Sequence, residues 1–175
     1  MPRRVACRCA RGFTLIEAMI VVVVVAIVAA MATARMGKTN SQKLIAAAQL
    51  LAADLNFAQI ESITKGQDPR VVVLNTPVGQ SHGYQIEATS NPGTPITNPV
   101  GKMPYQVTFG LGRAAALDGV TITGQSVGGD GRLGFRLYGQ LDQTTNATIT
   151  LACEGKSIVL TINAVNGEVT IGAVQ

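Results

Sequence analysis

The sequence contains no tryptophan, and aromatic residues make up only 4% of its 175 residues. This scarcity argues against a surface on which nucleic-acid bases or sugar rings stack on aromatic side chains. Charged residues are also few, at 14% compared with about 25% in an ordinary soluble domain. A chain of this length holds one small domain beside any apolar segment.

The net charge of +4 comes entirely from the first twelve residues. Arg3, Arg4, Arg8 and Arg11 lie there, while all ten acidic residues and the other ten lysines and arginines follow Gly12. The side chains after Gly12 therefore sum to zero. A basic surface that attracts acidic partners is not a property of the main body.

Cysteine occurs three times and histidine once. Cys7 and Cys9 precede the apolar run, and their spacing without a nearby histidine does not supply the four ligands of a structural zinc site. Cys153 lies in a strand-like run, where a buried thiol is expected and pairing with another chain is the alternative. No metal and no other cofactor is expected.

Residues 13–34 form the most apolar segment of the chain. Only Thr14, Glu17 and Thr33 interrupt it, and as a helix it spans roughly 33 Å, about the hydrocarbon thickness of a bilayer. The arginines before it predict that the N-terminus stays in the cytoplasm and that the body crosses the membrane. Glu17 needs an explanation, because a carboxylate inside a membrane is costly and normally has a partner.

Three common types of N-terminal segment each fail to account for a feature of this sequence. A signal peptide cut near Ala30-Met31-Ala32 would be long and would have to tolerate Glu17. A simple membrane anchor fits the length but leaves the acid unexplained. A lipoprotein signal at Cys7 fails because no apolar region precedes that cysteine.

Gly12-Phe13-Thr14-Leu15-Ile16-Glu17, between a short basic leader and a long apolar helix, resembles the class III signal of type IV pilins and of type II secretion pseudopilins. The resemblance implies that a prepilin peptidase removes residues 1–12 by cutting between Gly12 and Phe13 on the cytoplasmic side. It also implies that the same enzyme N-methylates Phe13.

The cut would create a partner for Glu17. The new α-amine of Phe13, on the same or a neighbouring chain, can pair with the carboxylate in a low-dielectric environment. Removing one member of such a buried pair costs about 3–5 kcal/mol. The alternative is that Glu17 only extends towards the membrane interface.

The sequence predicts one long helix over residues 13–63, with residues 35–65 as its amphipathic half. A stripe of small and apolar residues recurs there at steps of three and four: Leu44, Ala48, Leu51, Leu55, Ala58 and Ser62. Asp54, Gln59 and Glu61 fall off this stripe, and Gly37 is a candidate for a bend. The helix is expected to end near the Gly and Pro of KGQDPR.

The sequence pattern of residues 66–175 is typical of a β-rich domain. Strand-like runs separated by Gly, Asn and Pro are RVVVLN, GYQIEA, YQVTFG, GVTITG, RLGFRLY, ATITLAC, SIVLTIN and EVTIGA. Asn166-Gly167 predicts a hairpin between the last two runs, and the Pro-rich segment 90–104 is expected to be a loop. The expected fold is α+β and pilin-like, with antiparallel sheets or a sandwich packed on the second half of the helix.

Within this domain, residues 131–172 resemble the GspH/FimT group of pilin-like proteins. In that group a Phe-x-x-x-Gly stretch, here Phe135 and Gly139, precedes two strands and a closing hairpin that contains glycine. The resemblance implies a structural subunit of a filament rather than an enzyme.

Evidence for catalysis is weak. His82 is the single histidine, and the neighbouring Ser81 lacks the motif of a nucleophile elbow. The glycine-rich stretch 128–131 has neither the Lys-Ser/Thr of a phosphate loop nor the spaced acids of a calcium loop. We expect a tight turn there and no catalytic residue.

DNA binding is the competing function, because some FimT-type proteins take part in DNA uptake through exposed basic residues. The candidates in this chain are Arg113, Arg132, Arg136 and Lys156. Contacts to the phosphate backbone need several cations together, and these four are scattered in the sequence. DNA is therefore not the expected partner.

The main hypothesis is a minor pilin or pseudopilin of a type II secretion system or type IV pilus. The expected location is the bacterial inner membrane, with the C-terminal domain in the periplasm, and then the assembled pilus. Expected partners are other pilin-type subunits, the prepilin peptidase, the inner-membrane assembly platform and lipid, with a secreted substrate or the secretin as further possibilities. The second alternative is a secreted β-domain on a simple membrane anchor.

Overall fold

The computed structural model describes residues 15–75, 82–128 and 130–175, and within 29–39 it describes the helical backbone but not the side chains. Gly12 and Phe13, where the cleavage is predicted, lie outside the described residues. The chain divides into two compact units, residues 1–38 and residues 39–175, which are considered separately below.

Helix α1 comprises Leu15–Lys65, which confirms the predicted long helix; its C-terminal end lies two residues later than predicted, and residues 13 and 14 lie outside the described residues. It stops at Gly66, whose φ of +52° is a left-handed conformation that favours glycine, and the Gly66 N–H donates to the carbonyl of Ser62 at 3.0 Å. Gly37 lies within the helical backbone of α1, in the part where side chains are not described. The bend at this glycine stays a prediction.

Among the described residues, no helix is long and apolar enough to cross a membrane. The span expected over residues 13–34 extends beyond the described side chains at both of its ends.

In the second unit, the predicted helix stripe is the buried face of α1. All six stripe residues, Leu44, Ala48, Leu51, Leu55, Ala58 and Ser62, are buried. Asp54 falls off this stripe, as the sequence indicated, and is nevertheless buried, with only 4% of it exposed. A buried carboxylate requires hydrogen-bonding or charged partners, and these are described with the candidate site.

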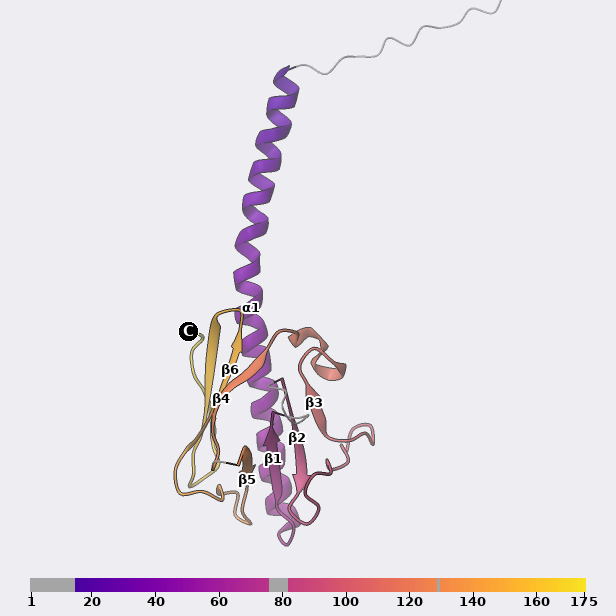
Figure 1. Ribbon diagram of the computed structural model, residues 1–175, viewed down its shortest axis with the longest axis vertical. Helices are drawn as coiled ribbons and strands as arrows, with labels where there is room; N and C mark the ends of the chain where they lie inside the picture. Colours follow the sequence, from indigo (N-terminus) through magenta and orange to yellow (C-terminus); the bar gives the residue numbers. More distant parts are fainter. Residues whose placement is uncertain (1–14, 76–81, 129) are drawn as a thin grey trace, which may run out of the picture. The chain divides into compact units, whose positions relative to one another are not determined.

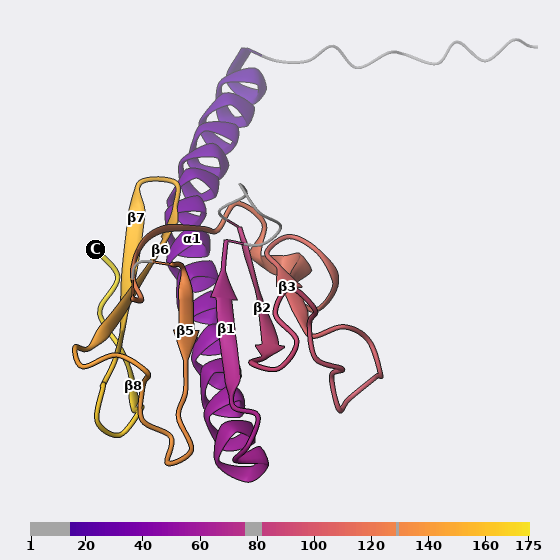
Figure 2. The same cartoon turned by 60° about the horizontal axis from the view of Figure 1, so that its bottom comes forward.

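Two antiparallel four-stranded sheets accompany the helix, and all eight predicted strands are present (Figures 1 and 2). The first sheet has the order β3-β2-β1-β5, made of Gln106–Thr108, Gly83–Ala88, Arg70–Leu74 and Arg132–Gly134. The second has the order β4-β6-β7-β8, made of Thr121–Ser126, Ala147–Cys153, Lys156–Ile162 and Val169–Ile171. A short 3-10 helix, η1, covers Gly112–Leu117 between β3 and β4.

Side chains from α1 and from both sheets form one hydrophobic core. Buried and half-buried residues alternate along the whole of β6, as expected for a strand with one face on the core. Cys153, at the end of β6, is a free and buried thiol, which confirms the expectation for this residue.

The segment 90–104, predicted to be a loop, forms more backbone hydrogen bonds with its surroundings than expected. Isolated β-bridges join Glu87 to Pro95 and Thr97 to Pro104. The N–H of Ile96 donates to the carbonyl of Ile86 on β2 at 2.8 Å. The segment is therefore held against the first sheet, because its backbone groups find partners there.

The predicted hairpin between the last two strands is confirmed, since β7 and β8 pair antiparallel. Its loop closes through the N–H of Gly167, which donates to the carbonyl of Asn163 at 2.9 Å. Gly167 has a φ of +68°, which explains the glycine at this position.

Candidate functional site

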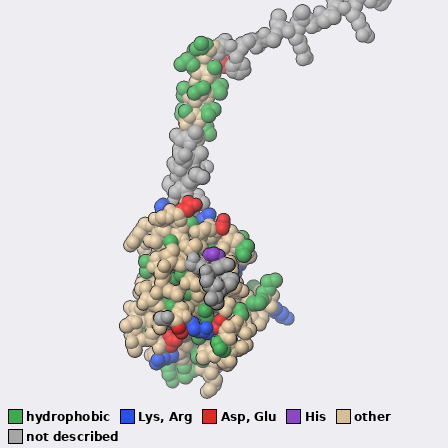
Figure 3. Space-filling model, viewed as in Figure 1, with side chains coloured by type: hydrophobic (Ala, Val, Ile, Leu, Met, Phe, Trp, Pro, Cys, Tyr) green, Lys and Arg blue, Asp and Glu red, His purple; other side chains and the backbone are tan. Residues whose placement is uncertain are grey.

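The first unit carries an acid on an otherwise apolar helix. Glu17 lies in the first turn of α1, where a negative charge interacts favourably with the helix dipole. The large apolar side chains described between Leu15 and Val28 are all exposed, by 51–80% (Figure 3). A helix that is apolar on all sides is stable only when lipid or other helices cover it.

The second unit holds a buried acidic cluster that the sequence did not reveal. Asp54 on α1 accepts hydrogen bonds from the hydroxyls of Tyr84 at 2.7 Å and Tyr105 at 2.9 Å. Arg113 of η1 completes the cluster with an ion pair to the same carboxylate. The buried charge is thus compensated by one cation and two hydroxyl donors.

The cluster changes the acidity of its members. Burial, reinforced by the negative charge of Asp54, raises the pKa of Tyr105 to about 12 and that of Tyr84 well above its ordinary value. For Arg113, burial is the largest single effect and lowers the pKa, but the charge of Asp54 together with the hydrogen bond and charges of Tyr105 and Tyr84 outweighs it, so the pKa is raised. Both tyrosines and the arginine therefore stay protonated in the folded chain at neutral pH.

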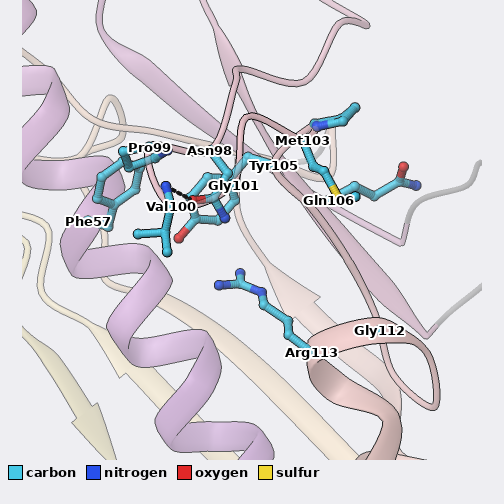
Figure 4. A pocket seen from close by; sticks show the side chains of 11 residues that line it. Phe57, Asn98, Pro99, Val100, Gly101, Met103, Tyr105, Gln106, Gly112 and Arg113 are labelled. Atoms are coloured by element: carbon cyan, nitrogen blue, oxygen red, sulfur yellow. Dashed lines mark hydrogen bonds between the residues drawn. The ribbon is translucent and has the colours of Figure 1, made fainter.

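A cavity of about 620 Å³ lies beside this cluster. The Tyr105 ring stacks on Phe57 of α1, with centroids 5.1 Å apart, and the Arg113 guanidinium carbon lies 4.8 Å from the Tyr105 centroid. In Figure 4 the guanidinium of Arg113 points into the space between η1 and the segment that carries Val100 and Tyr105.

The four basic residues considered for DNA binding lie on different elements. Arg113 is paired with Asp54, and Arg132 of β5 bonds Glu87 at 2.5 Å, where Glu87 is only 1% exposed. Two of the four thus neutralise buried acids. The other two make polar contacts as well: Arg136 Nη2 donates to the carbonyl of Asp142 at 3.1 Å, and Lys156 Nζ lies 2.8 Å from Ser41 Oγ.

The glycines of the GspH/FimT-like stretch meet at one side chain of the helix. Gln59 Nε2 donates to the carbonyl of Gly139 at 2.9 Å and to that of Asn166 at 2.7 Å. A methyl group at Gly139 would lie 2.9 Å from the same Nε2 atom, so Gln59 also requires the absence of a side chain there. The side-chain amide of Gln59 on α1 therefore binds two turns of the β-domain through hydrogen bonds.

His82 lies at a bend before β2, where its carbonyl accepts the N–H of Phe109 at 2.8 Å. Ser81 lies outside the described residues. Over 15–75, 82–128 and 130–175, no three His, Cys, Asp or Glu residues group in a way that could hold a metal ion.

Comparison with known proteins gives two family matches. Residues 7–33 match the prokaryotic N-terminal methylation motif, and residues 47–167 match the type II transport protein GspH family. Both agree with the resemblances drawn from Gly12–Glu17 and from residues 131–172. No curated protein sequence matches the chain.

Two crystal structures of the type IV minor pilin FimU from Pseudomonas aeruginosa have a similar fold, with TM-scores of 0.50 and 0.52. They share 21% and 22% identity with the chain, cover 73% and 74% of it, and are themselves covered to 91% and 88%. At this identity the likeness bears on the fold, and it confirms the predicted pilin-like α+β architecture.

Proposed function

We propose, from the premise that the chain belongs to the GspH family of type II transport proteins, that it is built into a filament through its N-terminal helix. The family consists of pilin-like structural subunits and not of enzymes. The observation that carries the proposal is the exposed apolar surface of α1 between Leu15 and Val28, which follows an N-terminal methylation motif. Such a surface needs a cover, and lipid before assembly and neighbouring helices after it would supply one.

Processing would precede assembly. In this proposal a prepilin peptidase cuts between Gly12 and Phe13 and methylates the new N-terminus. The subunit then waits in the inner membrane with its N-terminus in the cytoplasm and residues 66–175 in the periplasm, as the basic leader favours. The inner-membrane assembly platform would draw it from the lipid into the filament.

Glu17 would select the register of the incoming subunit. The α-amine of Phe13 on one chain and the carboxylate of Glu17 on its neighbour form a pair only when the helices are correctly staggered. In a medium of low dielectric constant, a mismatch leaves charges without their partners. The pair would therefore act mainly on specificity of assembly.

The filament is a type II secretion pseudopilus or a type IV pilus. The family description supports the first, and the fold shared with the minor pilin FimU supports the second. A secreted substrate or the secretin would be a contact of the β-domain in the first case. DNA capture is not favoured, since the candidate cations lie on different elements of the fold and Arg132 is engaged by the buried acid Glu87.

The intact mass of the mature protein tests the processing step. We expect the loss of residues 1–12 and the gain of one methyl group on Phe13. A chain cut after Ala32 would instead support a secreted domain and would overturn the proposal.

Incorporation into the filament tests the role of Glu17. Glu17→Gln should leave the processed protein in the membrane and reduce the amount found in sheared filaments by tenfold or more, which corresponds to about 1.4 kcal/mol. Glu168→Gln makes the same chemical change in the loop before β8 and serves as the matched control. Equal incorporation of both variants would refute the pairing.

A further inference from the structure

The cavity beside Arg113 has the composition of a recognition site rather than of a packing defect. Its volume of about 620 Å³ is within the range of ligand pockets. Aromatic and aliphatic side chains form most of its wall, including Phe57, Met103 and Tyr105. Arg113 is the one charged residue among the described residues that line it.

Arg113 is held in place by a buried acid behind the cavity and by an aromatic ring of its wall. Its Nη2 atom is engaged by the buried carboxylate of Asp54, and its guanidinium lies over the ring of Tyr105. The side chain is nevertheless 37% exposed, and in Figure 4 its guanidinium points into the cavity. A guanidinium fixed in this way is preorganised to bind a planar anion such as a carboxylate.

The rim of the cavity exposes apolar side chains. Val100 is 86% exposed and Met103 is 73% exposed. Hydrogen bonds hold this turn in shape: the N–H of Asn98 donates to the carbonyl of Met103, and the N–H of Val100 donates to Asn98 Oδ1, both at 2.8 Å. Apolar side chains held out into water by a braced turn are typical of a surface that another protein covers.

We propose that this cavity docks a segment of a neighbouring subunit in which a carboxylate adjoins an apolar side chain. The carboxylate binds the outward edge of Arg113, and the apolar side chain packs on Phe57, Tyr105 and Met103. Charge complementarity favours a protein segment, since Arg113 is the one cation of the described wall, the wall carries no acid, and most of its area is apolar. A nucleic acid would need several cations along its backbone. The identity of the occupant as a filament subunit rests on the proposed function.

Binding of short peptides to the full chain in detergent micelles tests the proposal. Met103 is the only methionine after residue 38, so its labelled methyl group reports on this cavity by NMR. The probes are acetyl-Leu-Glu-Leu-amide, its Leu-Gln-Leu counterpart, and a twelve-residue oligothymidylate. We expect the Glu peptide to shift the Met103 signal in a saturable way, with a Kd about tenfold lower than that of the Gln peptide.

Two variants give the matched comparison. Val100→Asp places an acid at the rim and should abolish the preference for the Glu peptide, whereas Val165→Asp makes the same change on the exposed loop before β8 and should preserve it. Equal affinity for the two peptides, no shift at about 10 mM peptide, equal effects of the two variants, or a Met103 shift caused by the oligothymidylate instead would each overturn the proposal.

The titration does not depend on processing or on filament assembly. A negative result with normal cleavage after Gly12 and normal incorporation therefore removes only this docking site. Abnormal cleavage with a positive titration removes the proposed function and leaves the site.

Discussion

The carboxylate of Asp54 on α1 is paired with the guanidinium of Arg113 on η1, 59 positions further along the chain. Asp54 is almost fully buried, whereas the side chain of Arg113 is 37% exposed. The pair thus connects the interior face of the helix to the wall of the cavity. It fixes η1 on the helix and fixes the direction in which Arg113 presents its remaining donors.

Replacing Asp54 by Asn should destabilise the second unit. The amide keeps the size of the side chain, but it removes the charge that compensates Arg113. We expect the free energy of unfolding to fall by about 2–3 kcal/mol, below the range for a fully buried pair because Arg113 reaches water. Urea unfolding of the full chain in micelles measures this.

Glu61→Gln is the matched control for that substitution. Glu61 lies on the same helix, and its side chain is 27% exposed at 3.5 Å from Arg70. Arg70 is buried but also pairs with Asp68 at the shorter distance of 3.1 Å, so the loss of Glu61 should cost less than about 1 kcal/mol. Similar losses in Asp54→Asn and Glu61→Gln would contradict the importance given to the buried cluster.

The two tyrosines of the cluster predict how stability depends on alkaline pH. The pKa of Tyr105 is about 12, and that of Tyr84 is raised well above 10. The folded chain holds these protons more tightly than the unfolded chain does. Their contribution to stability is therefore complete below about pH 10 and is lost as the pH rises towards about 12. Unfolding measured across this interval should show a shallower decline in Tyr105→Phe, and an unchanged slope would refute the assignment.

Much of the fold could be predicted because its periodicities are local. The helix stripe recurs every three or four residues, and the alternation along β6 and β7 follows the pleat of a strand. Glycine and proline mark the ends of these elements. The order of strands in the sheets could not be predicted in this way, because it depends on contacts between distant residues. β1 pairs with β5 across about 60 residues, and only the packed core determines which strands become neighbours.

The buried cluster could not be predicted for the same reason. Asp54 is one position away from Leu55 on the stripe, and in the sequence it looks like any acid on a polar helix face. Its partners come from β2, from the residue before β3 and from η1, and no residue near Asp54 in the sequence indicates them. The cavity likewise arises only where the turn after Asn98 meets η1.

Two glycines with the same backbone conformation allow the cost of backbone strain to be measured separately from the cost of steric crowding. Gly139 and Gly155 have φ values of +78° and +79°. A methyl group at Gly155 would meet nothing within 4 Å, whereas at Gly139 it would lie 2.9 Å from Gln59 Nε2 and 3.0 Å from Ile63 Cδ1. We expect Gly155→Ala to cost about 1–2 kcal/mol through backbone strain, and Gly139→Ala to cost about 1–3 kcal/mol more. Thermal unfolding of the two variants checks this, and equal costs would exclude Gln59 as the reason for Gly139.

The buried acid of the first sheet predicts the acid limb of the stability curve. Burial of Glu87 opposes its charge, but hydrogen bonds from the Gly93 N–H, Gln85 and Arg132 outweigh burial and lower its pKa below 4.5. The folded chain therefore binds this proton more weakly than the unfolded chain. The resulting stability is present above about pH 4.5 and is lost as the pH falls through the folded pKa.

Arg132→Gln should expose this dependence. Without the guanidinium, Glu87 keeps its burial and loses its cation, so the free energy of unfolding at neutral pH should fall by about 3 kcal/mol. The acid-induced decline that Glu87 contributes should also become smaller, because without Arg132 the pKa of Glu87 in the folded chain lies closer to its value in the unfolded chain. Arg136→Gln is the matched control, because Arg136 is exposed and donates to a backbone carbonyl, and we expect a loss below about 1 kcal/mol. Urea unfolding between neutral and acid pH distinguishes the two, and a loss in Arg136→Gln as large as in Arg132→Gln would mean that Glu87 does not depend on its cation.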